Sequence, residues 1–347
     1  MDINYIRIRE KIVGDEELNL LDKAYHFTFS NLKNIENSDV RLCLMTHICG
    51  VTKMLSNFNV DIVTLVGSLL YVAVYTGVSY EILECEFSSN IAKIAFLLAD
   101  INKEELRGNF VSDESKLNRL YCDKEQNLEN GKVFLVKLAE RFYNMQNMID
   151  CFGVDKKVIV SDTLKVLVPL ASKFEFNYIK GKLEDLCLLY MRPDDYNYIL
   201  LKLNNEPKEL EIYLDNAVKD ISLLLRKEAI LFESAFRVKS IFSIYQKLCM
   251  GKKWEDIYDI LAVTIIVDNI VECYRVLNII CSNFKTVSGR FKDYIVNPKK
   301  NMYQSLHITI VDNNGQFIEI QIKTYDMNKR NKLGYSDYKR SRQKSII

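Results

Sequence analysis

Residues Leu306 to Ile322 read LHITIVDNNGQFIEIQI and carry the clearest strand pattern in the chain. Apolar and polar residues alternate on both sides of the turn-forming segment 312–315, which is the pattern of two antiparallel strands joined by a tight connection. If the hairpin is symmetric about that turn, four polar side chains share one face of a sheet. Those side chains form the cross-strand pairs Thr309 with Glu319 and His307 with Gln321. The opposite face then carries Ile308, Ile310, Ile318 and Ile320.

The rest of the chain divides into a helical half and a sheet-containing half. Residues 260–267 form a continuous apolar run rich in β-branched side chains, which is typical of an interior strand. Before about residue 225, apolar residues instead recur at three- and four-residue spacing, which indicates helices. The expected helices span 16–34, 40–57, 60–75, 89–101, 115–122, 127–149, 159–173 and about 208–234. A chain of 347 residues exceeds one typical core. We therefore predict an α+β protein with an all-α domain at 1–200 and a mixed-sheet α/β domain at 201–347.

The composition is that of a folded globular protein with an uneven charge. Apolar residues make up 48% of the chain and charged residues 27%, and the net charge of +1 argues against a protein that coats nucleic acid. From Lys285 onward, however, thirteen Lys and Arg stand against five Asp and Glu, a local net charge of +8. Such a segment would attract a polyanion, and a nucleotide triphosphate fits as well as RNA does.

The sequence also predicts where the protein acts. The N-terminus has no basic segment followed by an apolar stretch, and no apolar run is long enough to span a bilayer. The nine cysteines include no CxxC pair, which favours reduced thiols over a disulfide framework or a zinc site. We expect a cytoplasmic protein without a membrane partner.

Polar groups gather in the second half at positions where an ordinary strand or helix would not need them. Ser240, Ser243 and Lys247 share one helical face, and Ser240 stands where an N-cap that favours phosphate would be. Asp259 and Glu319 are carboxylates on otherwise apolar strands. Converging cations and two carboxylates indicate a metal-dependent transfer of a phosphoryl-type group. From the residues alone, a solvated basic face with two structural carboxylates stays open as the alternative.

The same segments resemble the synthetase domain of the RelA/SpoT family over roughly residues 225–340. Matching phrases in matching order are Arg237–Lys239, Ser243–Lys247, Asp256–Val263, Gly289–Ile295, Tyr303–His307 and Glu319–Ile322. The resemblance implies a nucleotidyltransferase-like fold and the transfer of the β,γ-pyrophosphate of ATP to the 3′-hydroxyl of GTP or GDP. The product would be (p)ppGpp, the alarmone of the stringent response. ATP and GDP or GTP would be the partners, with no nucleic acid as a substrate.

The resemblance also implies roles for individual residues. Asp259 and Glu319 would be the catalytic carboxylates and would hold Mg²⁺, with Glu319 near the 3′-hydroxyl as the base. The ATP-binding residues would be Arg237, Lys239, Ser243 and Lys247. The guanine nucleotide would be bound by Lys292, Lys299, Asn301, Tyr303, His307 and Gln321, with the tyrosine stacked on the base. The Arg290-x-Lys292-Asp293 pattern resembles the one that goes with a preference for GDP in this family.

Three residues depart from the family pattern. Thr264 and Lys323 each stand in place of an arginine, and Met302 stands in place of a glycine before the stacking tyrosine. A lysine keeps the charge but loses the two-pronged geometry that a guanidinium offers to phosphate. These changes argue against a fast synthetase and keep a non-catalytic nucleotide-binding regulator open as the rival hypothesis. An RNA-binding module built on the basic tail 339–344 is a weaker rival, because no RNA-binding signature accompanies that tail.

Residues 20–200 resemble, more weakly, the HD-type hydrolase domain of the family, which removes the 3′-pyrophosphate with Mn²⁺ held by histidines and aspartates. His47 falls on the first ligand position, but Tyr71-Val72 replaces the His-Asp pair and Glu140 replaces the final aspartate. The acidic catalytic pair is also lost, at Val74-Tyr75. One imidazole and one carboxylate are too few to hold a divalent metal in an open catalytic site. We therefore expect no Mn²⁺ and no hydrolase activity in this domain.

Overall fold

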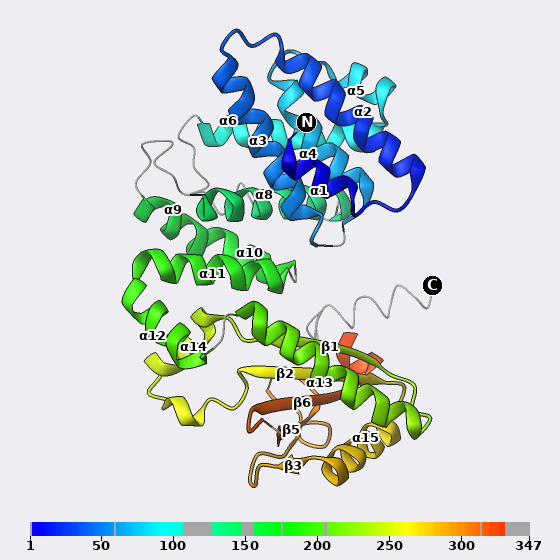
Figure 1. The fold of residues 1–347 in the computed structure, drawn as a ribbon, viewed down its shortest axis with the longest axis vertical. Helices are drawn as coiled ribbons and strands as arrows, with labels where there is room; N and C mark the ends of the chain where they lie inside the picture. Colours follow the sequence, from blue (N-terminus) through cyan, green and yellow to red (C-terminus); the bar gives the residue numbers. More distant parts are fainter. Residues whose placement is uncertain are drawn as a thin grey trace. The chain divides into compact units, whose positions relative to one another are not determined.

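The computed structural model describes residues 2–58, 60–106, 127–147, 156–174, 176–204, 207–300, 302–312 and 314–329. The chain separates into two compact units, Met1–Met191 and Arg192–Ile347. The first unit is helical in its described part, and the second combines helices with one sheet (Figure 1). This confirms the predicted α+β class, with a helical region before a mixed-sheet region. The predicted domain boundary after residue 200 lies inside α12 (Pro193–Leu203), a helix of the second unit.

Four helices of the first unit pack around one buried helix, α4 (Ile62–Val74). Its sequence is apolar along nearly its whole length. Almost every side chain is buried against α2 (Asp15–Leu32), α3 (Ser38–Leu55), α6 (Ser89–Leu106) and α8 (Asn127–Gln146). Asp61 fixes the start of α4, because its carboxylate accepts the N–H of Thr64 at 2.9 Å. Gly67 permits the close approach of α6, since a Cβ at that position would lie 2.6 Å from the side chain of Ile94.

The remaining elements of the first unit follow the predicted helical periodicity closely. They are α1 (Ile3–Arg9), α2 (Asp15–Leu32), α3 (Ser38–Leu55), α5 (Tyr80–Glu86), α6 (Ser89–Leu106), α8 (Asn127–Gln146), α9 (Lys156–Asp162), the π-helical turn η1 (Thr163–Leu167), α10 (Val168–Lys173) and α11 (Asn177–Met191). The short helices α1 and α5 were not predicted, because seven residues carry too little periodicity. The helix predicted at 115–122 lies outside the described residues.

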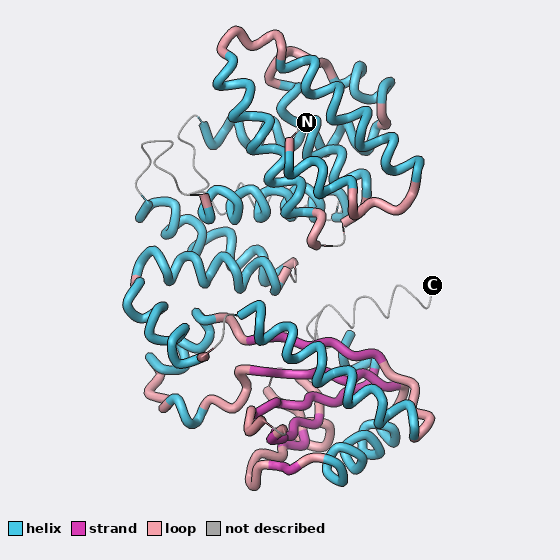
Figure 2. The backbone as a smooth tube through the Cα atoms, in the orientation of Figure 1, coloured by secondary structure: helices cyan, strands magenta, loops and turns pink. Residues whose placement is uncertain are grey.

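The second unit is built on a mixed sheet (Figure 2). Its elements after α12 are α13 (Pro207–Lys227), β1 (Glu233–Val238), α14 (Ile241–Cys249), the 3-10 turn η2 (Trp254–Asp256), β2 (Leu261–Val267), α15 (Ile270–Asn283), β3 (Lys285–Thr286), β4 (Lys292–Asp293), β5 (Leu306–Val311) and β6 (Phe317–Thr324). The strand order is β1-β2-β6-β5-β3, and β4 pairs with β5. Strands β2 and β6 run parallel, whereas the other pairs are antiparallel. Helices α13 and α15 pack on this sheet.

The predicted helix at about 208–234 is wrong in its last part. Helix α13 ends at Lys227, and Ala229 adopts a left-handed conformation with φ of 54°. The N–H of Ile230 then donates to the carbonyl of Leu225 at 3.1 Å, which closes the helix end. The chain leaves this turn directly into β1. The end of this helix could not be recognised in the sequence, because alanine, not glycine, occupies the left-handed position.

The register of the predicted hairpin is confirmed. Thr309 pairs with Glu319 and His307 pairs with Gln321 across β5 and β6. The predicted strand at 260–267 is β2, which starts at Leu261. No helix of the described residues is long and apolar enough to cross a membrane.

Candidate functional site

One face of the sheet carries aligned polar residues from several strands. Because register partners on neighbouring strands point to the same side, the pairing defines two rows across the sheet. The first row contains Arg237, Ala262, Glu319 and Thr309. The second row contains Ala235, Thr264, Gln321, His307 and Lys292. The opposite face is apolar and includes the buried side chains of Ile308, Ile310, Ile318, Ile320 and Ile322.

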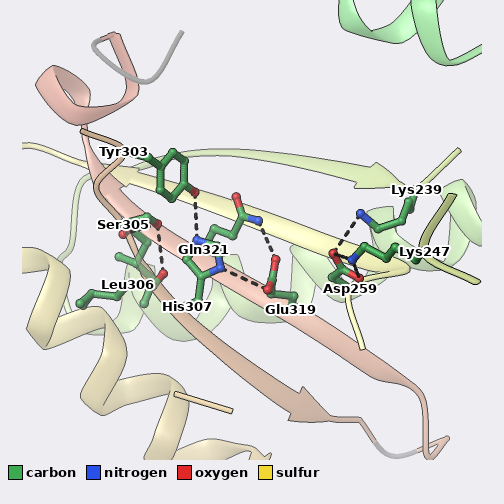
Figure 3. Close-up of polar contacts among 10 residues, drawn as sticks. Lys239, Lys247, Asp259, Tyr303, Ser305, Leu306, His307, Glu319 and Gln321 are labelled. Carbon is green, nitrogen blue, oxygen red and sulfur yellow. Dashed lines mark hydrogen bonds and ion pairs between the residues drawn. The ribbon is translucent and has the colours of Figure 1, made fainter. Parts of the chain in front are cut away.

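Asp259 lies at the start of β2, where two lysines reach it. Its Oδ2 lies 2.9 Å from Nζ of Lys239, and Nζ of Lys247 lies 2.7 Å from Oδ1 and 2.6 Å from Oδ2 (Figure 3). The backbone fixes one of these lysines, because the N–H of Lys239 donates to the carbonyl of Ile260 at 2.7 Å. Sequence reasoning placed all three residues in the site, and the structure brings them into direct contact.

These contacts oppose the effect of burial on the charges. Burial by itself would raise the pKa of Asp259, but the hydrogen bond from Lys247 and the charge of Lys239 hold that pKa at about 2. The pKa of Lys239 is lowered by burial, which outweighs the opposing effect of Asp259. The carboxylate of Asp259 is therefore ionised at neutral pH, whereas burial disfavours the charged form of Lys239.

Helix α14 positions Lys247. Ser240 is its N-cap, since Oγ of Ser240 accepts the N–H of Ser243 at 3.3 Å and lies 2.7 Å from the hydroxyl of Ser243. The predicted N-cap is thereby confirmed. Lys247 lies in the last turn, on the same face of the helix as the two serines.

Glu319 is held at both oxygens by side chains of the same sheet. Its Oε1 lies 3.2 Å from Nδ1 of His307, and its Oε2 accepts Nε2–H of Gln321 at 2.6 Å (Figure 3). The hydroxyl of Tyr303 lies 2.9 Å from Nε2 of the same imidazole. A carboxylate can only accept, so Nδ1 carries a proton, and in the neutral imidazole Nε2 accepts the hydrogen bond of the phenol.

This arrangement keeps Glu319 ionised. Burial by itself would raise its pKa, and the negative charge of Asp259 acts in the same direction. The hydrogen bond from His307, followed by the bond from Gln321, outweighs both, so the pKa lies below its usual value. The carboxylate is fixed in orientation as well as in charge.

Tyr303 lies among groups that suit a planar ligand. Nζ of Lys299 is 4.9 Å from its ring centroid and 4.6 Å from that of Tyr294, both within the range of a cation–π contact. Burial raises the pKa of Tyr303, so its hydroxyl stays protonated at neutral pH. Tyr294, which sequence reasoning did not assign, packs edge-on against the ring of Tyr303 at 6.1 Å and that of His307 at 5.2 Å.

The turn before Tyr303 explains why a glycine is expected there. Met302 has φ of 62°, the left-handed region that glycine adopts without strain. Its N–H donates to the carbonyl of Lys299 at 2.7 Å, and the N–H of Lys299 donates to the carbonyl of Tyr303 at 3.2 Å. These two hydrogen bonds therefore hold Met302 in a strained backbone conformation. The predicted site residue Asn301 lies outside the described residues, as does the basic tail 339–344.

The residues of the Arg290-x-Lys292-Asp293 pattern do different things. Lys292 pairs with His307 and so lies at the end of the second polar row. Asp293 accepts the hydroxyl of Tyr274 at 2.7 Å and two backbone N–H groups at 2.9 Å. The guanidinium of Arg290 stacks on the ring of Tyr258, 3.8 Å from its centroid. Tyr258 and Tyr274 lie in segments that match the family pattern, but the sequence assigned them no role, because only the tertiary contacts reveal what they touch.

The first unit holds a buried polar network where the resemblance places a metal. Glu140 is paired with Lys137 at 2.7 Å, and it also accepts from Asn102 at 3.3 Å and from the hydroxyl of Tyr71 at 3.4 Å. His47 bonds to the side chain of Asn144 at 2.8 Å. Among the described residues, no group of three or more His, Cys, Asp and Glu side chains could hold a metal ion. This donor set does not fit a catalytic Mn²⁺ site.

The two carboxylates of the second unit do fit Mg²⁺. Protein sites bind this ion through one or two carboxylates, with substrate phosphates and water as the remaining ligands. Asp259 and Glu319 lie near enough for the charge of one to act on the pKa of the other. Two carboxylates alone leave most of an octahedral shell unfilled, and water and phosphate oxygens are the ligands that usually fill it.

Comparisons with known proteins point to one family. Residues 236–343 match a family model described as a region found in RelA / SpoT proteins. A guanosine-3′,5′-bis(diphosphate) 3′-pyrophosphohydrolase from Aquifex aeolicus is 32% identical over 295 residues, with 84% of this chain and 42% of that protein covered. A GTP pyrophosphokinase from Myxococcus xanthus is 30% identical over 321 residues, with 91% of this chain and 42% of that protein covered. The chain thus spans less than half the length of these curated relatives.

Solved structures give a further comparison. The small alarmone synthetase 2 from Bacillus subtilis is 30% identical, covers 41% of this chain and 82% of its own, and superposes with a TM-score of 0.34.

Proposed function

The chain belongs to the RelA/SpoT family through its residues 236–343, and from that premise we propose that it is a GTP pyrophosphokinase. It transfers the β,γ-pyrophosphate of ATP to the 3′-hydroxyl of GDP or GTP and releases AMP. The observation that carries this proposal is the convergence of Lys239, Lys247 and Asp259 at one end of a polar sheet face that also carries Glu319 and His307. We further propose that the protein is cytoplasmic and serves the stringent response.

The ATP side of the proposed site is cationic. Lys239 and Lys247 carry ammonium groups within 3 Å of Asp259, and Arg237 lies in the first polar row. The hydroxyl of Ser243 lies at the start of α14, where the helix dipole also favours negative charge. These four residues would bind the triphosphate. The three cations would also neutralise the charge that builds up as the bond between the α- and β-phosphates breaks.

The two carboxylates would bind the metal ion, and one of them would also act as the base. Asp259 and Glu319 would hold Mg²⁺, which supplies positive charge to the phosphate oxygens when it is bound. Glu319 would also take the proton of the 3′-hydroxyl as the 3′-oxygen bonds to the β-phosphorus. AMP leaves with the oxygen that bridged the α- and β-phosphates. Because His307 and Gln321 fix one oxygen of Glu319 each, the base is already oriented before the substrate arrives.

The guanine nucleotide would bind beside Tyr303. The ring of Tyr303, with Nζ of Lys299 over it, offers a stacking surface for the guanine base. Lys292 and Lys299 would bind the phosphates, together with Asn301, and His307 and Gln321 would border the ribose end near Glu319. The basic Arg290-x-Lys292-Asp293 pattern supports a preference for GDP.

We also propose that the first unit has no hydrolase activity. The donor set supports this, since Glu140 is neutralised by Lys137 and Tyr71 points its hydroxyl at the same carboxylate. A divalent metal would need carboxylate and imidazole ligands that this donor set does not supply.

The test is to incubate the purified chain with labelled ATP, Mg²⁺ and either GDP or GTP, beside a Glu319→Gln variant. We expect AMP and a 3′-pyrophosphorylated guanosine nucleotide from the wild type and neither product from the variant. Nucleotide binding without any product would reject the synthetase and favour the regulator. A parallel incubation of (p)ppGpp with Mn²⁺ should release no pyrophosphate, and release that depends on Glu140 would reject the second proposal.

A further inference from the structure

The charges around Asp259 do not balance. The carboxylate contributes one negative charge, while Lys239 and Lys247 contribute two positive charges within 2.9 Å of it. The three side chains are 22%, 11% and 25% exposed, so water screens them only in part. These three side chains together therefore carry a net positive charge.

Both oxygens of Asp259 already serve as hydrogen-bond acceptors. Lys247 binds Oδ1 and Oδ2, and Lys239 binds Oδ2. A divalent cation that arrives alone would have to displace these donors and approach two ammonium groups at short range, which Coulomb repulsion opposes. The other carboxylate, Glu319, is likewise engaged at both oxygens, by His307 and Gln321.

A triphosphate would reverse this balance. Its negative charges attract the same two ammonium groups, and lysine side chains are flexible enough to move from the carboxylate to the phosphates. The move frees the oxygens of Asp259 and supplies phosphate ligands for the metal. The displaced lysines still have partners, so neither ammonium is left buried without a counter-charge.

We propose that Lys239 and Lys247 block the metal site of the free chain, and that the site accepts a divalent cation only together with the triphosphate. The inference rests on the proposed function, since it assumes that ATP binds at these lysines. It gives the two lysines a second role besides phosphate binding, in which they set the order of assembly and keep Asp259 from holding a metal without substrate.

The experiment measures binding of Mn²⁺, a paramagnetic stand-in for Mg²⁺, from the loss of its free electron paramagnetic resonance signal. Wild type, Asp259→Asn and Lys247→Met are titrated with Mn²⁺ alone and then with α,β-methylene-ATP, which cannot be cleaved at the reacting bond. Without nucleotide we expect the wild type to bind no more Mn²⁺ than Asp259→Asn. With the analogue the wild type should gain a site that Asp259→Asn lacks.

The deciding variant is Lys247→Met, which removes one ammonium from a partly exposed position. It should bind Mn²⁺ without nucleotide roughly tenfold or more tightly than the wild type, as expected when a like charge a few ångströms away is removed. The double variant Lys247→Met, Asp259→Asn should lose that gain. A lysine that acted only as a structural or phosphate-binding group would produce no gain.

Three results would overturn the proposal, and they separate its failure from that of the proposed function. The blocked site would be rejected if the wild type bound Mn²⁺ without nucleotide and this binding disappeared in Asp259→Asn. It would also be rejected if Lys247→Met gained no Mn²⁺ affinity. In both cases, binding of α,β-methylene-ATP would leave the proposed function standing. Failure of the wild type to bind the analogue, with and without Mn²⁺, would reject both the order of assembly and the ATP site itself.

Discussion

Replacing Lys137 with methionine should destabilise the helical unit more than most single substitutions do. Lys137 and Glu140 form an ion pair of 2.7 Å, with side chains that are 8% and 11% exposed. Methionine keeps the length of the side chain but leaves the carboxylate buried without its ammonium partner. Breaking a buried pair in this way costs about 3–5 kcal/mol. The matched control is Lys23→Met, whose exposed pair with Glu86 at 3.0 Å is worth about 0–1 kcal/mol.

The dependence of this loss on pH follows from the direction of the pKa shift. Burial by itself would raise the pKa of Glu140, but Lys137 is the strongest of several groups that hold it below its usual value. A depressed folded-state pKa contributes stability above the unfolded-state pKa of about 4.3, and this stability is lost as pH falls through the folded value. With Lys137 replaced, burial dominates and the folded pKa rises above the unfolded one. The variant then loses stability as pH rises from about 4.3.

Urea denaturation of the full chain, followed by circular dichroism at about pH 5 and about pH 7, measures both effects. The loss in Lys137→Met should be larger at the higher pH. The double variant Lys137→Met, Glu140→Gln should recover most of the stability, because no unpaired charge is left inside the protein. A loss of less than about 1 kcal/mol, or an equal loss at both pH values, would refute the assignment of this network as a buried ion pair.

Three further changes test other parts of the structure. Gly50→Ala should lower the free energy of unfolding, measured by thermal denaturation, by about 1–3 kcal/mol, because its Cβ would lie 2.3 Å from the ring of Tyr143. The control Gly131→Ala, with 4.0 Å to the nearest side chain, should not lower it, and equal losses of stability in the two variants would contradict the prediction. Met302→Gly should stabilise the second unit by about 1 kcal/mol in urea, since it relieves the left-handed strain, and a loss of stability would argue against that strain. Tyr303→Phe keeps the stacking ring but removes the hydroxyl that bonds the imidazole; it should lower kcat of the synthetase with little change in KM for GDP, and a raised KM with unchanged kcat would point to nucleotide contact instead.

The sheet was predicted best where the sequence carries a strict alternation. The β5–β6 register followed from the turn residues and the period of two, because a slip by one residue would expose the isoleucines and bury the polar groups. Strand β1 (Glu233–Val238) was missed, since its exposed edge position imposes no alternation. The extent of α13 was also overestimated, because the left-handed turn at Ala229 has no glycine to signal it.

The candidate residues were named from the sequence, but most of their side-chain contacts were not. The order of the phrases located Asp259, Glu319 and His307, since these were carried by the resemblance to a family. That Lys247 binds both oxygens of Asp259 depends on where α14 ends relative to β2, a tertiary feature that spacing along the chain does not encode. The same holds for Tyr294, whose position against His307 only the folded chain reveals.

The lysine–carboxylate cluster is balanced in charge in the first unit but not in the second, because the number of lysines and the burial of the side chains differ. In the first unit one lysine meets one carboxylate, both nearly inaccessible to water, and neutral donors such as Asn102 complete the network. Such a network leaves no direct charge imbalance for an anion to satisfy. At Asp259 two lysines share one carboxylate, and burial lowers the pKa of Lys239 even beside its partner. A polyphosphate would relieve that imbalance, and the excess of positive charge at Asp259 is consistent with the proposal that this part of the chain binds nucleotide.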